Sequence, residues 1–107
     1  MDDSTTQPDA SIAAHQRYLR QMVSDRGFEG ESVSQKFMLL LEEAGVFAQA
    51  ARKQANLAQA TDVSIEDVND AAADLFLILL DICNTLEIDL EQAFIAREQK
   101  NQTRTWE

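Results

Sequence analysis

The sequence is poor in residues that break helices and in residues that cross-link chains. Its 107 residues include three glycines, one proline and one cysteine. Few glycines and prolines leave few sharp turns, so long helices are expected. The single cysteine, Cys83, excludes an internal disulfide framework and a zinc site built from cysteines. The expected setting is therefore reducing and cytoplasmic.

Long apolar runs and positive charge are scarce as well. The longest uncharged apolar run covers residues 75–80 and stops at Asp81, well short of the roughly 18 residues that a membrane span needs. The first residues lack the basic flank and apolar stretch of a signal peptide, so none is expected. The 9 Lys and Arg against 19 Asp and Glu give a net charge of −10. This charge argues against binding to a nucleic acid polymer, because basic side chains must neutralise its phosphates.

The length and composition are those of one all-α domain. Apolar residues make up 45% of the chain and charged residues 26%, the usual range for a globular domain. Residues 1–8 are polar and without periodicity, which predicts a disordered tail followed by a domain at 9–107. Apolar residues at helical spacing predict four helices, which form a bundle. Their expected ranges are about 9–24, 32–56, 65–86 and 89–104.

Polar residues at the starts of these segments predict the helix caps. Either Ser32 or Ser34 is expected to cap the second helix. Asp89 is expected to cap the fourth, with Gln92 at the third helical position.

The third predicted helix carries an acidic stripe on an otherwise apolar surface. At 100° per residue, four polar side chains fall within about 40° of Asp74. Most other positions between 75 and 86 are apolar, so this helix needs neighbours on several sides. One four-helix chain supplies too few of them, which predicts a homo-oligomer, most simply a dimer that pairs third helices. The other stripe residues are Asp67, Asp70, Asp81 and Thr85.

The acidic stripe has no basic partner on its own helix. No Lys or Arg occurs between Lys53 and Arg97, whereas nine acids do. Carboxylates beside apolar walls need a cation or an open, hydrated edge to stay charged. One interpretation is a site for Mg²⁺ or Mn²⁺, which prefer hard oxygen ligands. The other is a solvated polar face, and the helix alone leaves both open.

The last predicted helix carries a basic face. Four strong hydrogen-bond donors have the spacing i, i+3, i+4, i+7, so they share one side of the helix. They suit compensation of the helix dipole at its C-terminus and equally a grip on phosphate groups. A metal held by carboxylates and a separate basic face is the combination that polyphosphate chemistry requires. These residues are Arg97, Lys100, Asn101 and Arg104.

Several of these segments together resemble a known family. They are residues 41–45 (LEEAG), 67–74 (DVNDAAAD) and 88–94 (IDLEQAF), followed by the basic face. In this order the chain resembles the MazG-like nucleotide pyrophosphohydrolases of the all-α NTP pyrophosphatase superfamily. The resemblance implies a four-helix bundle completed by oligomerisation, as a homodimer or a dimer of dimers. It also implies house-cleaning hydrolysis of nucleoside triphosphates to the monophosphate and pyrophosphate, with Mg²⁺ held between two helices.

The motif of this family, EExxE followed by ExxD, is only partly present. Its first half is matched by Glu42 and Glu43, but its third acid is replaced by Val46. In its second half Ala71 replaces the first acid and Asp74 matches the last. The resemblance therefore implies catalytic roles for the two glutamates.

The resemblance also implies the remaining site residues. The metal ligands are Glu43 and Asp74, and Asp70 stands one turn from Asp74, where it can replace a missing ligand. The substrate phosphates would complete the coordination of Mg²⁺. The predicted phosphate-binding residues are Arg97, Lys100, Asn101, Arg104 and Lys36.

The two replaced acids leave three hypotheses open. The first is a Mg²⁺-dependent pyrophosphohydrolase impaired by Val46 and Ala71, which cannot bind a metal. The second is a catalytically inactive protein of the same fold that binds nucleotide. The third is a helical association module with no ligand, because apolar stripes more often form a core than a ligand site.

Overall fold

The computed structural model describes residues 11–26, 30–55 and 65–103. All regular structure in these ranges is helical, which confirms the all-α prediction. The predicted tail at 1–8 lies outside the described residues. The helices are α1 (Ile12–Asp25), α2 (Val33–Ala55), α3 (Ile65–Thr85) and α4 (Leu90–Thr103).

Local side-chain hydrogen bonds set where the first two helices begin. The Ser11 hydroxyl accepts the amide of Ala14 at 3.0 Å, so α1 starts at Ile12 and not near residue 9 as predicted. At α2, the Ser32 hydroxyl accepts the Gln35 amide at 3.1 Å, and the Gln35 side chain accepts the Ser32 amide at 2.8 Å. This reciprocal pair is a capping box, and it decides for Ser32 over Ser34.

Hydrogen bonds fix the turn between α3 and α4 at both of its ends. Glu87 has a φ of 58°, and the amides of Glu87 and Ile88 return to the carbonyls of Asn84 and Cys83. This is the Schellman arrangement, in which glycine is the usual residue at the left-handed position. Glutamate there costs on the order of 1 kcal/mol. The Asp89 carboxylate then accepts the Gln92 amide at 3.0 Å, as predicted for the cap of α4.

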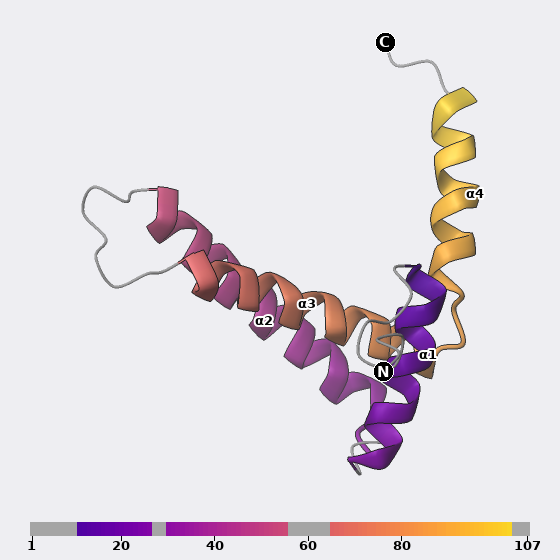
Figure 1. The fold of residues 1–107 in the computed structure, drawn as a ribbon, viewed down its shortest axis with the longest axis horizontal. Coiled ribbons are helices and arrows are strands. Elements are labelled where there is room, and N and C mark those ends of the chain that lie inside the picture. Colours follow the sequence, from indigo (N-terminus) through magenta and orange to yellow (C-terminus); the bar gives the residue numbers. More distant parts are fainter. Residues whose placement is uncertain (1–10, 27–29, 56–64, 104–107) are drawn as a thin grey trace, which may run out of the picture.

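The four helices pack in an open arrangement (Figure 1). The long helices α2 and α3 lie side by side and antiparallel, and α1 packs on the C-terminal end of α3. Helix α4 contacts α1 and extends away from the α2–α3 pair. The core lies where α1 meets α3 and contains Leu19, Leu80, Ile82 and Cys83. Burial there raises the pKa of the Cys83 thiol above its usual value.

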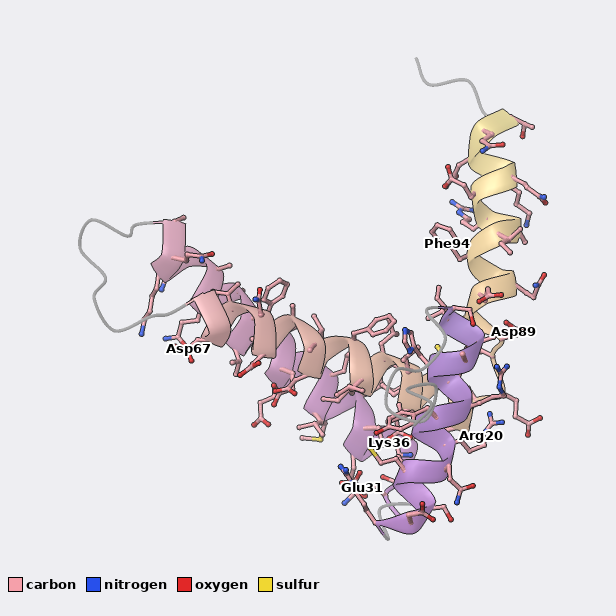
Figure 2. All side chains as sticks on the ribbon, in the orientation of Figure 1. Arg20, Glu31, Lys36, Asp67, Asp89 and Phe94 are labelled. Atoms are coloured by element: carbon pink, nitrogen blue, oxygen red, sulfur yellow. The ribbon has the colours of Figure 1, made fainter. Side chains whose placement is uncertain are left out.

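Among the described residues, many large apolar side chains of α2, α3 and α4 are exposed. Leu41 is 73% exposed and Met38 is 71% exposed, both on α2. Phe94 of α4 is 60% exposed and points into the open angle between α4 and the α2–α3 pair (Figure 2). Large exposed apolar patches often mark surfaces that bind another protein. None of the helices in the described ranges is long and apolar enough to cross a lipid bilayer.

Candidate functional site

One ion pair shows how α2 and α3 are aligned. The Lys36 ammonium lies 3.2 Å from Asp81 Oδ1 and donates to Thr85 Oγ1 at 2.9 Å. Because the helices are antiparallel, a step forward along α2 corresponds to a step back along α3. We call two positions that lie opposite each other, one on each helix, a level. Lys36 and Asp81 form the 36/81 level, near the end of the pair that α1 covers (Figure 2).

The same alignment brings Glu43 and Asp74 to one level. Each lies seven residues from the ion pair, which is about 10.5 Å along the helix and about 20° short of two full turns. Both therefore remain on the sides of α2 and α3 that carry the ion pair. Glu43 is half-buried and Asp74 is exposed. The 43/74 level thus combines two carboxylates, whereas the 36/81 level combines a carboxylate with a lysine.

Two further predicted site residues border this level. Glu42 precedes Glu43 on α2, Asp70 lies one turn from Asp74 on α3, and both are exposed to solvent. Within the ranges that the structure describes, however, no three or more Asp, Glu, His or Cys side chains gather closely enough to hold a metal ion. Mg²⁺ is commonly held by one or two carboxylates together with water and substrate phosphates. The described carboxylates of α2 and α3 therefore do not form a closed, protein-only metal site.

The two positions where the motif lacks its acids also share a level. Counting three steps on from Glu43 and three back from Asp74 gives Val46 and Ala71. Val46 is 46% exposed, whereas Ala71 is 4% exposed. Both positions lie about 4.5 Å along the helices from the 43/74 level, but Ala71 faces the helix interface whereas Val46 is largely open to solvent.

Lys36 has protein partners at the place where the sequence predicts a phosphate ligand. Its side chain is 5% exposed, and its ammonium is engaged by Asp81 and Thr85 of α3. The acidic stripe has no basic partner on its own helix, as the sequence indicates, but Asp81 pairs with a lysine of the neighbouring helix. The partner comes from α2, 45 residues away in the sequence, which is too far for a local pattern to show.

The basic face of α4 lies apart from the acids of α2 and α3. Arg97 and Lys100 are exposed, and Asn101 is half-buried. Arg104 lies outside the described residues. Because α4 extends away from the α2–α3 pair (Figure 1), one chain does not bring this face to the 43/74 level. A site that uses both sets of residues needs a second chain.

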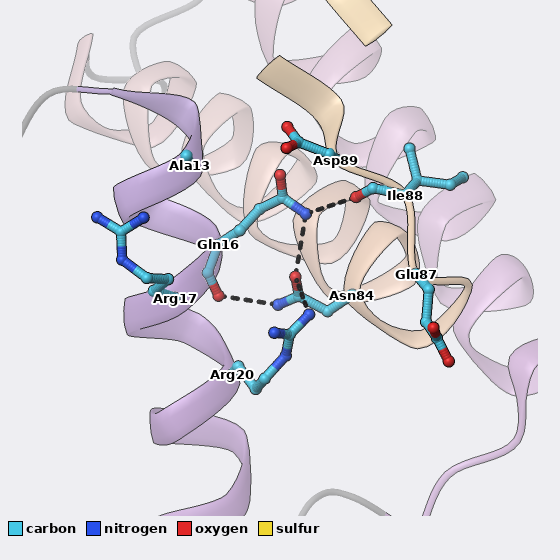
Figure 3. Close-up of a pocket in the computed structure, with 8 residues that line it drawn as sticks. All are labelled: Ala13, Gln16, Arg17, Arg20, Asn84, Glu87, Ile88 and Asp89. Carbon is cyan, nitrogen blue, oxygen red and sulfur yellow. Dashed lines mark hydrogen bonds between the residues drawn. The ribbon is translucent and has the colours of Figure 1, made fainter. Parts of the chain in front are cut away.

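A polar junction that the sequence analysis missed joins α1 to the start of α4 (Figure 3). Gln16 is buried, and its amide donates to Asn84 Oδ1 at 3.0 Å and to the Ile88 carbonyl at 2.9 Å. Its side-chain oxygen accepts the Leu90 amide at 3.0 Å. Asn84 in turn donates to the Gln16 carbonyl at 3.0 Å, and Arg20 donates to Asn84 at 3.2 Å.

This junction lines a cavity of about 560 Å³ together with Arg17, Glu87 and Asp89. Gln16 and Asn84 satisfy the hydrogen-bonding groups of each other and of the nearby backbone. Residues that hold two helices together have this arrangement. Their partners lie 64 to 74 residues apart in the sequence, so no local motif could have revealed them.

Comparison with known proteins gives no relative for this chain. No protein-family model, no curated protein and no solved structure matches it.

Proposed function

We propose that this chain is a Mg²⁺-dependent nucleoside triphosphate pyrophosphohydrolase of the MazG-like type, impaired by the loss of two motif acids. The observation that carries the proposal is the 43/74 level. Glu43 and Asp74 come from two separate parts of the resembling motif, and counting along both helices from the Lys36–Asp81 ion pair puts them at one level. Two carboxylates at one level are the minimum that a Mg²⁺–polyphosphate complex needs from a protein.

The chemistry follows from the residues at this level. A Mg²⁺ ion held there would neutralise and polarise the phosphate oxygens of the substrate. Glu43 and Asp74 provide the oxygen ligands, with Asp70 one turn away. Glu42 orients a water molecule and takes its proton as the water oxygen bonds to the α- or β-phosphorus. The phosphoanhydride bond breaks, and the nucleoside monophosphate and pyrophosphate leave.

The phosphate grip of this proposal needs a second copy of the chain. Arg97, Lys100, Asn101 and Arg104 are the residues whose donors suit a leaving pyrophosphate. Because α4 extends away from its own acids, they would act on the substrate bound to another copy. The uncovered apolar side chains of α2 and α4 support such an assembly, as a homodimer or a dimer of dimers.

A second candidate function is nucleotide binding without hydrolysis. It is favoured by the 46/71 level, where valine and alanine stand in place of two carboxylates. Loss of both acids removes two of the five motif acids but leaves Glu43 and Asp74 to bind Mg²⁺ with phosphates.

The two candidates are separated by measuring pyrophosphate release. Wild-type protein is incubated with a panel of natural and modified deoxynucleoside triphosphates and Mg²⁺ or Mn²⁺. We expect slow release that is abolished by EDTA and falls at least about tenfold in Asp74→Asn, because loss of a metal ligand commonly removes more than 1.4 kcal/mol of transition-state stabilisation.

The control is Glu31→Gln, which removes one exposed acid ahead of α2 with the same change in net charge. It should leave the rate unchanged. Release that survives EDTA and Asp74→Asn would contradict the metal role. Metal-dependent nucleotide binding without any release would favour the second candidate.

A further inference from the structure

We propose that the ion pair between Lys36 and Asp81 acts as a register lock, which fixes the axial alignment of α2 and α3. Lys36 is then a positioning residue that holds Glu43 at the level of Asp74, two turns away. The alignment itself is independent of any activity, whereas its value for metal binding rests on the proposed function.

The burial of Lys36 supports this proposal. Among the described residues of α2 and α3, Lys36 is the only buried charged side chain, at 5% exposure, and Asp81 is 21% exposed. A buried ammonium is costly unless it is paired and hydrogen-bonded. Lys36 meets this condition through Asp81 and Thr85, and the Thr85 hydroxyl donates to the Asp81 carbonyl at 2.9 Å. Sliding α2 along α3 by one turn would break both contacts and leave a buried charge unpaired.

The neighbouring apolar contacts, unlike the ion pair, have no single required partner. The partly buried positions of α2 include Ala44, Ala50 and Ala51 beside the larger Leu40 and Phe47, and α3 contributes Ala71 and Ala72 beside Leu75 and Ile78. Apolar contact has no direction, so a slide exchanges one such contact for another, at a cost set by how the larger side chains repack. The buried ammonium, in contrast, has its charged partner in one register only. A single polar group that fixes the register of packed helices is an established use of a buried ion pair or hydrogen bond.

A slide would also alter the candidate site. Moving α3 by four residues relative to α2 would bring Glu43 opposite Ile78 or Asp70. In the first case the carboxylate would face an apolar side chain, and in the second it would face Asp70 while Asp74 lost its partner. The two acids share a level only in the register that the Lys36–Asp81 pair selects.

The test measures the register directly with two spin labels. Ser34→Cys on α2 and Asn69→Cys on α3 introduce label sites that are exposed, in a Cys83→Ala background. They are offset by about 20 Å along the helix pair, so a slide changes their distance almost one for one. With labelled protein diluted into an excess of unlabelled chains, so that the other copies in an oligomer carry no label, pulsed electron–electron double resonance should give one narrow distance distribution. Lys36→Met and Asp81→Asn should broaden it or shift it by about 5 Å, the rise of one turn.

Three comparisons make the result specific. Lys36→Met and Asp81→Asn change the net charge in opposite directions, so a shared effect cannot come from charge alone. The reversed pair, Lys36→Glu with Asp81→Lys, should restore the narrow distribution. Lys53→Met, which removes another lysine from α2, should leave it unchanged. Circular dichroism checks that each variant is folded. If Lys36→Met does not fold, the distance distribution of Asp81→Asn tests the proposal instead.

An unchanged distance distribution in the folded Lys36 and Asp81 variants would overturn the register lock. Binding of Mn²⁺ with a non-hydrolysable triphosphate, measured on the same proteins, separates the two proposals. A shifted register with weaker Mn²⁺ binding supports both. A shifted register with unchanged Mn²⁺ binding supports the lock and contradicts the metal role of the 43/74 level.

Discussion

Restoring the two motif acids together, as Val46→Glu with Ala71→Glu, is expected to raise metal-dependent pyrophosphate release on the order of 100-fold. The two positions share a level about one turn from Glu43 and Asp74. Four carboxylates on two adjacent levels can enclose a Mg²⁺ ion, which two cannot. Lewis-acid stabilisation of the developing charge contributes several kcal/mol to the barrier, and about 2.7 kcal/mol gives this factor.

Without metal, the same double variant is expected to be less stable than the wild type. Ala71 is 4% exposed, so a glutamate there is largely desolvated and lies near Glu43 and Asp74. We expect the double variant to unfold at a lower temperature than wild type in EDTA. Mg²⁺ or Mn²⁺ should then restore stability by about 2.7 kcal/mol at a free concentration of 100 times the dissociation constant. Thermal unfolding with and without metal measures this difference.

The control for this variant is Val46→Gln with Ala71→Gln, which adds side chains of the same shape without charge. It should show neither metal-dependent stabilisation nor pyrophosphate release above wild type. If the glutamate pair also shows neither, positions 46 and 71 are not part of a metal site. The resemblance to the MazG-like enzymes then does not extend to the metal-binding acids of their motif.

Replacing Leu41 by glutamate is expected to dissociate the homo-oligomer. Leu41 and Met38 lie three residues apart on α2 and are the two most exposed large apolar side chains of the described residues. Burying a leucine contributes about 1.5–3 kcal/mol, and a two-fold interface contains each residue twice. The loss is therefore about 3–6 kcal/mol per dimer, which weakens the dissociation constant by roughly 10² to 10⁴.

Sedimentation equilibrium at micromolar concentration tests this expectation. Wild type should be a dimer or tetramer, and Leu41→Glu should be a folded monomer. The matched control is Gln49→Glu, which adds one negative charge at another exposed position of α2 and should not change the assembly. A monomeric wild type, or a Leu41→Glu variant of unchanged mass, would show that this face has another use.

The sequence placed the starts of α2 and α4 closely, because the determining contacts there are local, although it left Ser32 and Ser34 open and put the start of α1 near residue 9 instead of at Ile12. The capping pair of Ser32 and Gln35 spans three residues, as does the cap of α4 by Asp89. The acidic stripe also follows from helical periodicity, and Lys36 binding to both Asp81 and Thr85 confirms that these two share a side of α3. Backbone hydrogen bonding within a helix fixes which side each residue faces, so a residue count is enough to place it.

The sequence was not sufficient where a contact joins distant segments. Nothing near Lys36 indicates that Asp81 is its partner, and nothing near Gln16 indicates Asn84. The direction of α4 depends on the turn at Glu87, whose left-handed conformation is unusual for this residue type. The separation between the basic face of α4 and the acids of α2 and α3 could therefore not be predicted from spacing along the chain.

The most direct test of the metal site is a crystal soaked with Mn²⁺ and a non-hydrolysable nucleoside triphosphate. If the proposed metal site is present, an anomalous peak is expected between α2 and α3. Carboxylate oxygens of Glu43 and Asp74 should lie about 2 Å from the ion, and phosphate oxygens should complete its coordination. An ion bound elsewhere, or Glu43 and Asp74 turned apart into solvent with the nucleotide present, would contradict it.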